Sequence, residues 1–88
     1  GLPEDMAGIS GRITGESIEL TAVSPGSPAW EAGLREGDVL LSIDGIETGT
    51  DLVLVDSLSE GPAGAARTVR VVRDGSEFEA RVVLRPLL

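Results

Sequence analysis

The chain has 88 residues, enough for one small domain with a single hydrophobic core. It contains no histidine, cysteine or tyrosine, which excludes Ser-His-Asp and Cys-His catalysis, thiol redox chemistry, disulfides and the usual nitrogen- and sulfur-ligated zinc sites. Seven Lys plus Arg against 15 Asp plus Glu give a net charge of −8, so nucleic acid is not an expected partner.

The N-terminal part of the chain predicts a tail followed by two strands. Residues 1–6 carry a proline and two acids without periodicity, and are expected to form a tail or loop ahead of a folded domain at 7–88. Residues 7–13 place Ala7, Ile9 and Ile13 on one face of a first strand, a candidate edge strand. Residues 17–23 alternate polar and apolar, which predicts a half-buried second strand.

A short helix is predicted next, at residues 28–32. Ser27 and Pro28 follow the rule of an N-cap residue and a proline at the first helical position, and Gly33 suits the left-handed stop. Residues 38–43 are apolar enough for a central third strand, which the turn at Asp44-Gly45 closes.

Residues 51–60 are ambiguous by propensity because they include several β-branched side chains. Helical spacing decides the assignment in favour of a second helix. Leu54 and Leu58 fall on one face, expected to contact the core, and Leu52, Val55 and Ser59 form an adjacent stripe.

The C-terminal part predicts a β-hairpin. Residues 67–73 and 77–84 have strand character, and Asp74-Gly75 between them is a strong two-residue hairpin signal. The order is therefore strand, strand, short helix, strand, helix, strand, strand. A small antiparallel sheet with two helices belongs to the α+β class or to the capped barrels. No apolar run approaches the roughly 20 residues of a membrane span, so direct membrane insertion is not expected.

Residues 24–45 read SPGSPAWEAGLREGDVLLSIDG. This stretch closely resembles the central signature of the bacterial PDZ domain family, in which an SPA..AGL..GD.I stretch precedes a (V/I)DG turn. Arg73-Asp74-Gly75 stands at the expected distance, so the resemblance covers about residues 7–84. It implies a small PDZ-like fold, a five-stranded antiparallel β-sandwich or partly open barrel capped by two helices.

The resemblance implies a non-catalytic module that captures C-terminal or extended polypeptide segments by β-strand addition, in a groove between a sheet edge and the second helix. In the family, backbone amides of an apolar-Gly-apolar loop hold the terminal carboxylate, and Ala7-Gly8-Ile9 is the candidate loop. The candidate peptide-binding residues are Ala7, Gly8, Ile9, Ser10, Gly11, Arg12 and Ile13 on the strand, and Leu52, Val55, Asp56 and Ser59 on the helix.

Other interpretations of these positions stay open at the level of sequence. If the helix phase is shifted by one residue, Asp51 and Leu58 line the groove instead. The first strand can also be an ordinary edge strand, and Leu52 and Val55 can be simple core residues. The mostly aliphatic stripe favours an apolar C-terminal residue in the ligand, and Arg12 would add favourable charge.

Four acids surround the second helix: Glu47, Asp51, Asp56 and Glu60. A solvated acidic face is the usual meaning of such a set, and selection of basic ligand residues is the alternative. Their spacing matches no calcium loop, and neither a metal nor a cofactor is expected. The single tryptophan, Trp30, is interpreted as a ring lying over aliphatic neighbours rather than as a docking contact.

Enzymatic alternatives do not fit the residues. An aspartic protease needs Asp-Thr-Gly or Asp-Ser-Gly, whereas glycine follows Asp44 directly, and no histidine or lysine is present to activate a serine. The resemblance instead implies a substrate-recognition or regulatory domain of a larger bacterial envelope protease, of the trypsin-like high-temperature-requirement, C-terminal-processing or site-2 type. It implies a protease domain in the same chain and an extracytoplasmic location. A docking or assembly domain with no peptide ligand is the alternative.

Overall fold

The computed structural model describes residues 6–86, without the side chain of Leu58. The elements in chain order are β1 (Ile9–Thr14), β2 (Ser17–Val23), α1 (Pro28–Glu31), β3 (Val39–Ile43), β4 (Ile46–Glu47), α2 (Leu52–Ser59), β5 (Ala66–Arg73) and β6 (Ser76–Val83). The predicted α+β class is confirmed, with all five predicted strands and both helices in place. The two-residue strand β4 was not predicted, because two residues are too few to show a periodicity.

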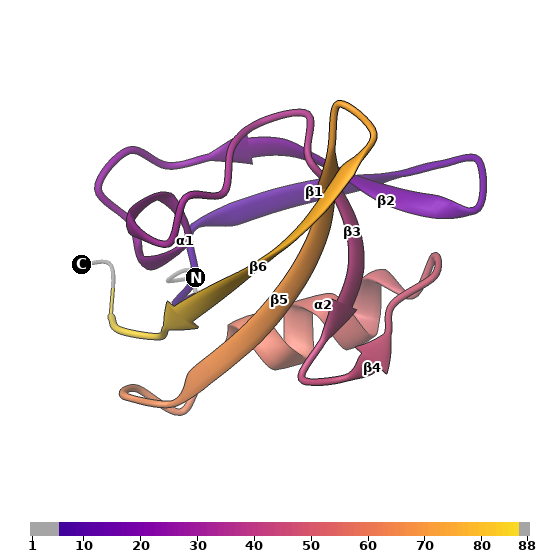
Figure 1. Cartoon of the computed structure of the whole chain (residues 1–88). Helices are drawn as coiled ribbons and strands as arrows, with labels where there is room; N and C mark the ends of the chain where they lie inside the picture. The colour runs from indigo at the N-terminus through magenta and orange to yellow at the C-terminus, as the bar shows by residue number, and fades with distance from the viewer. Residues whose placement is uncertain (1–5, 87–88) are drawn as a thin grey trace.

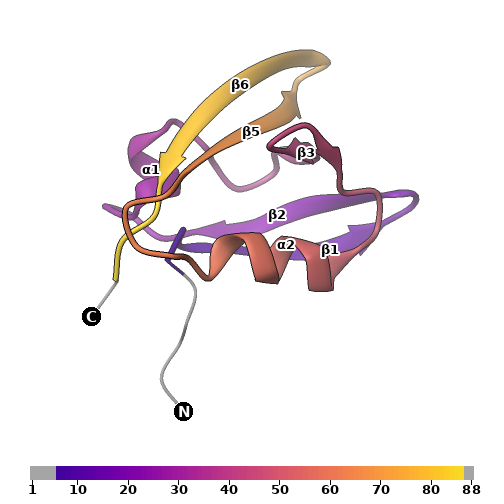
Figure 2. The same ribbon diagram turned by 90° about the horizontal axis from the view of Figure 1, so that it is seen from below.

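The strands form one antiparallel sheet in the order β1-β2-β3-β5-β6, and β4 pairs with β3 outside this path. The third predicted strand is thus central and the first lies at an edge, as expected. The sheet curls so that the β5–β6 hairpin and the β1–β2 hairpin form two facing layers (Figures 1 and 2). This curl gives the partly open barrel that the resemblance implies.

Two Asp-Gly pairs make the tight turns of the sheet. Asp44 and Gly45 have φ values of 53° and 80°, and Asp74 and Gly75 have φ values of 52° and 80°. Two successive positive φ angles define the turn whose twist matches a β-hairpin, and Asp-Gly is a preferred pair for it. The turns predicted after β3 and between β5 and β6 are therefore confirmed.

The core lies between the two layers of the sheet. Its largest buried apolar side chains come from β2, β3, β5 and β6 and from the segments that follow α1 and β6: Ile18, Leu20, Leu34, Leu40, Val71, Val82 and Leu84.

Strict alternation along β2 is the first prediction that the structure corrects. Ile18 and Leu20 are buried as expected, but Ala22 is exposed and Val23 is buried. The pairing with β1 shifts register here, since Ser10 faces Ala22 while Gly11 faces Leu20. An extra residue in one strand of a pair reverses the faces that follow it, and this bulge turns Val23 inward. Ile9 of β1 and Ala7, which precedes the strand, lie against the core, whereas Ile13 is 51% exposed.

The short helix α1 has the predicted caps. The Ser27 hydroxyl accepts a hydrogen bond from the Trp30 backbone N–H at 3.2 Å, and Gly33 ends the helix with φ at 101°. Trp30 is half-buried and packs against the core, as the favoured interpretation requires. The Arg35 guanidinium covers the ring, with its central carbon 3.6 Å from the ring centroid, a cation–π arrangement.

An ion pair between a buried carboxylate and a partly exposed guanidinium joins the residue before β3 to the end of β5. The Asp38 side chain is 1% exposed, and its carboxylate accepts the Arg35 backbone N–H at 2.9 Å. Arg73 donates to both carboxylate oxygens of Asp38 at 2.7 Å, and also to the Gly33 carbonyl. The hydrogen bonds to Asp38 raise the pKa of Arg73 above its ordinary value, although burial acts in the opposite direction.

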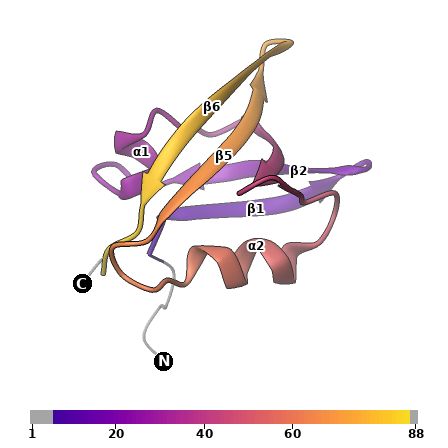
Figure 3. The ribbon, with the colours of Figure 1, turned by 60° about the horizontal axis from the view of Figure 1, so that its bottom comes forward.

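The helix α2 lies alongside β1, on the outside of the sheet (Figure 3). Asp51 is its N-cap, and the Asp51 carboxylate accepts the Leu54 backbone N–H at 2.9 Å. The prediction that Leu54 contacts the core is wrong, since Val55 is 5% exposed in the core while Leu54 is only half-buried and outside it. The Leu58 side chain lies outside the described part of the structure. Neither helix among the described residues is long and apolar enough to cross a membrane.

Candidate functional site

A groove lies between the open edge of β1 and the helix α2. Figure 3 shows the two elements running side by side, with α2 next to the strand that has no further neighbour in the sheet. The groove is lined by residues of β1, β2 and α2 and by the residue that ends α2: Ile9, Gly11, Leu20, Leu52, Val55, Asp56, Ser59 and Glu60. One wall is therefore strand backbone, and the other is a helix face.

The backbone of β1 has its hydrogen-bonding groups arranged for a further strand. Thr14 and Ser17 flank the two-residue turn of the β1–β2 hairpin and so form a hydrogen-bonded pair. Hydrogen-bonded and non-hydrogen-bonded pairs alternate in an antiparallel ladder. The N–H and C=O groups of Gly11 and Ile13, whose partners are Leu20 and Ile18, therefore point away from β2 toward the open edge.

Gly11 forms part of the groove floor and has no room for a side chain. A Cβ atom at this position would lie 2.9 Å from Cγ2 of Ile18 and 3.4 Å from the Glu19 carbonyl oxygen. Because glycine brings no side chain to the edge, another backbone can approach β1 closely at this point.

The loop before β1 is held by its carbonyl groups. The Ala7 carbonyl accepts the Ala29 N–H, and the Gly8 carbonyl accepts the Ser24 N–H, both at 2.9 Å. In a trans peptide the next N–H points opposite to the carbonyl, so the amides of Gly8 and Ile9 point away from α1 and from Ser24. Gly8 adopts a φ of 86°, in the region that favours glycine.

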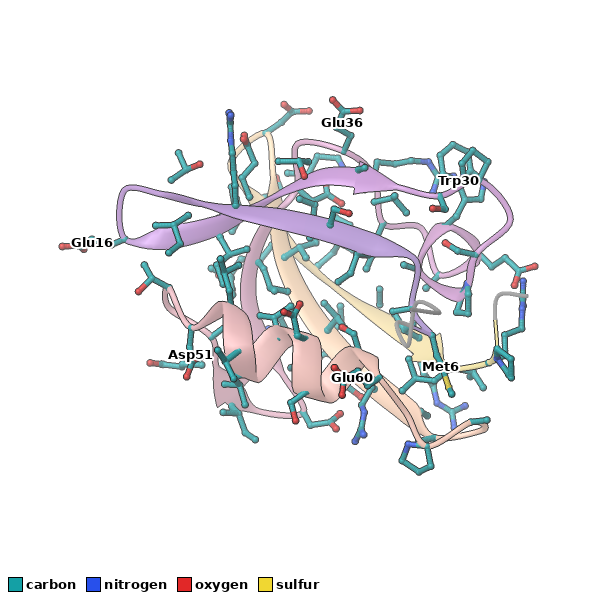
Figure 4. The ribbon with its side chains drawn as sticks, turned by 180° about the vertical axis from the view of Figure 1, so that it is seen from behind. Met6, Glu16, Trp30, Glu36, Asp51 and Glu60 are labelled. Atoms are coloured by element: carbon teal, nitrogen blue, oxygen red, sulfur yellow. The ribbon has the colours of Figure 1, made fainter. Side chains whose placement is uncertain are left out.

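The C-terminal end of α2 is fixed next to this loop. The Met6 backbone N–H donates to the Ser59 carbonyl at 2.7 Å, and the Ser59 hydroxyl donates to the Val55 carbonyl at 2.8 Å. Figure 4 shows Asp51 and Glu60 at opposite ends of the helix, with Met6 beyond the Glu60 end. The groove thus runs from the N-cap of α2 toward the loop at residues 7–9.

A small apolar pocket adjoins the loop end of the groove. It shares Ile9 and Ser59 with the groove, and its remaining lining includes Ala7, Val82 and Leu84.

The structure brings all of the predicted helix residues to the groove but few of the strand residues. All four predicted residues of α2 line it, whereas only Ile9 and Gly11 do so among those predicted before and on β1. The Arg12 side chain is 68% exposed and pairs with Glu19 at 3.2 Å, away from the groove lining. Asp51, the alternative helix residue, acts as the N-cap instead.

Sequence reasoning missed Leu20 as a lining residue and assigned Glu60 only to a general acidic set. Leu20 faces Gly11 across the strand pair and belongs to the groove lining, although it is only 1% exposed. No sequence signal separated Leu20 from the other core residues of β2. Glu60 follows Asp56 by one helical turn, and this spacing was visible in the sequence.

A comparison with family models matches residues 19–73, more than half of the chain, to the PDZ domain. Among curated proteins, the magnetosome formation protease MamE of Paramagnetospirillum magneticum is 34% identical over 77 residues, covering 88% of this chain and 11% of that protein. A probable periplasmic serine endoprotease, DegP-like, of Hahella chejuensis is 37% identical over 68 residues, covering 77% of this chain and 14% of that protein. The chain thus spans only a small part of these relatives.

Solved structures show the same fold at low sequence identity. The photosystem II D1 C-terminal processing protease matches with a TM-score of 0.85 at 23% identity, over 96% of this chain and 24% of that one. The HtrA-type protease AlgW, S227A variant with a decapeptide, matches with a TM-score of 0.80 at 22% identity, over 93% of this chain and 29% of that one. The signature, the fold and the family match agree, and the chain belongs to the PDZ domain family, as a binding module rather than a catalytic domain.

Proposed function

We propose that the chain binds an extended polypeptide segment, which adds to the sheet as a new strand at the edge of β1. The observation that carries the proposal is the groove between β1 and α2, with the backbone groups of Gly11 and Ile13 directed toward it. Main-chain hydrogen bonds supply affinity in this mode of recognition, and side-chain pockets supply specificity.

A C-terminal segment is the preferred ligand. The amides of Gly8 and Ile9 at the loop end of the groove are the candidates to hold a terminal carboxylate, as successive N–H groups in a turn hold anions. The N–H of Ser10, the next residue, alternates toward β2 and is not among these candidates. An apolar terminal side chain would lie against Ile9 at the loop end of the groove. Ala7, Arg12 and Ile13 flank this arrangement, and Leu52, Val55, Asp56 and Ser59 form its helix wall.

The parent protein is proposed to be a bacterial envelope protease in which this domain recognises substrates or regulates activity. Support comes from the relatives, which carry the names of proteases, one of them described as probably periplasmic. The proposed partners are a protease domain in the same chain and polypeptide segments captured outside the cytoplasm.

An amide-resolved NMR titration tests the binding mode. Short peptides with an apolar C-terminal residue are added to the 15N-labelled chain, once with a free C-terminus and once amidated. We expect chemical-shift changes confined to residues 7–13 and 52–59, and their loss on amidation, because the amide removes the terminal negative charge.

A single N-methyl group at the peptide residue facing Gly11 removes one main-chain hydrogen bond and should weaken binding by about 1 kcal/mol.

A pair of variants controls for indirect effects. Leu52→Gln changes the groove wall, whereas Ile46→Gln changes a side chain that is 48% exposed on β4 and outside the groove lining. Only the first should weaken binding. Shifts centred on Trp30, or none at all, would overturn the peptide-binding proposal in favour of a docking domain with no peptide ligand.

A further inference from the structure

The groove carries negative charge on its helix wall and positive charge nowhere. Asp56 and Glu60 are both exposed and both line it, and no arginine is among its lining residues. Among the described residues, five of the seven arginines form ion pairs, and their carboxylate partners all lie outside the groove lining: Glu19, Asp44, Glu77, Asp38 and Glu31. Asp56 and Glu60 belong to no ion pair within the described part of the chain.

These two carboxylates lie where the helix itself disfavours them. Asp56 and Glu60 are four residues apart, so they share one face of α2, and like charges at this spacing repel. Asp56 also lies in the C-terminal half of the helix and Glu60 is its C-cap, at the end where the helix dipole favours positive charge. A cationic side chain placed in the groove would relieve both effects.

The spacing between the apolar and the acidic parts of the helix wall matches the spacing of two side chains on one face of an extended peptide. The first half of the helix wall is apolar, with Leu52 and Val55, and the second half carries Asp56 and Glu60. At about 1.5 Å per helical residue, the centres of the two halves lie roughly 7 Å apart. Alternate side chains of an extended strand point to the same face and are separated by about the same distance.

We propose that the groove selects peptide segments that carry a lysine or arginine facing Asp56 and Glu60, together with an apolar side chain facing Leu52 and Val55. The inference rests on the proposed peptide-binding function and adds the chemistry of the ligand. The basic side chain also offsets the repulsion between a terminal carboxylate and a domain of net charge −8.

Matched octapeptides test this selection. All of them consist of Ser and Ala residues and end in a valine with a free carboxylate. In each peptide one residue is replaced by Lys, Gln or Glu. This replacement is made in turn at each of the four positions that precede the terminal valine. At low salt we expect the Lys peptide to bind about two- to fivefold more tightly than the Gln peptide at positions facing α2, and the Glu peptide more weakly than both. The preference should disappear above about 0.5 M salt, where exposed charges are screened.

Charge-neutral variants locate the effect. The double variant Asp56→Asn with Glu60→Gln should bind the Lys and Gln peptides equally. The control, Glu16→Gln with Glu36→Gln, removes the same charge from positions that lie away from α2 in Figure 4, and should keep the preference. The inference would be overturned if the unchanged chain bound the Lys, Gln and Glu peptides equally, or if both double variants lost the preference for Lys to the same extent. Either result would leave the proposed peptide-binding function standing. Failure of every peptide to bind would overturn the proposed function, and the inference with it.

Discussion

Asp38 and Arg73 show how one residue pair holds two distant parts of the chain. The pair joins the turn after α1 to the end of β5, and Arg73 also donates to the Gly33 carbonyl and lies 4.7 Å from the Phe78 ring centroid. The Asp38 side chain is 1% exposed whereas that of Arg73 is 40% exposed, so the carboxylate is the group that depends on its partner. The hydrogen bonds to Asp38 raise the pKa of Arg73, and an arginine guanidinium is charged at ordinary pH in any case.

Removal of this guanidinium should destabilise the domain strongly. In Arg73→Met the buried Asp38 carboxylate keeps only its hydrogen bond from the Arg35 N–H, so we expect a loss of about 2 to 3 kcal/mol in the free energy of unfolding. Urea denaturation followed by circular dichroism measures it.

Arg70→Met is the matched control on the same strand. The Arg70–Glu77 pair is about half exposed on both sides, with side-chain exposures of 49% and 55%. Its loss should cost less than about 1 kcal/mol. Equal effects of the two variants would show that Asp38 does not depend on Arg73.

At the scale of elements, α2 is the wall on which the candidate groove depends. Its eight residues are too few for an isolated helix to be stable, so it is held by its cap and by the packing of Val55 and Leu52. The sequence predicted the helix and its start. It did not establish which face meets the sheet, because Leu54 and Val55 are adjacent apolar residues and only the position of β1 decides between them.

Loss of the N-cap should weaken both the fold and the groove. Asp51→Ala removes the acceptor of the Leu54 N–H, so we expect a loss of about 1 kcal/mol in the free energy of unfolding, with weaker peptide binding. Asp51→Asn keeps an oxygen acceptor and should preserve both, because asparagine caps nearly as well. If Asp51→Asn lost binding as Asp51→Ala does, the carboxylate would be acting on the ligand and not as a cap. Thermal unfolding and the peptide titration distinguish these results.

At the scale of the whole molecule, stability comes from the core enclosed by the curled sheet. Leu40 is 1% exposed on β3, the central strand, and pairs with Ile18 of β2 and Val71 of β5, both fully buried. A domain of this size has a total stability of only about 5 to 15 kcal/mol, so a single core position can carry a large part of it.

Shortening the Leu40 side chain at the centre of the core should remove a large part of the domain's stability. We expect Leu40→Ala to lower the free energy of unfolding by about 2 to 5 kcal/mol, because it removes buried apolar surface and leaves a cavity. Val53→Ala is the control, since Val53 is 79% exposed on α2 and alanine favours helix, so it should change stability by less than about 0.5 kcal/mol. Comparable losses in the two variants, measured by urea denaturation, would place the stabilising contacts outside the sheet.

The sequence alone determined the features that depend on a few neighbouring residues. Ser27 and Gly33 bounded α1, the two Asp-Gly turns closed their hairpins, and the stretch at residues 24–45 indicated the family. Such features are local, because a cap or a tight turn is specified by the backbone angles and hydrogen bonds of three or four consecutive residues.

Only the tertiary structure decided the features that depend on distant partners. Four features require two segments to meet: the bulge that turns Val23 inward, the choice of Val55 over Leu54, the place of Leu20 in the groove lining opposite Gly11, and the pairing of Asp38 with Arg73. Each segment alone has several faces of similar hydrophobicity. Which face is buried is decided only when another part of the chain packs against it and removes its apolar surface from water.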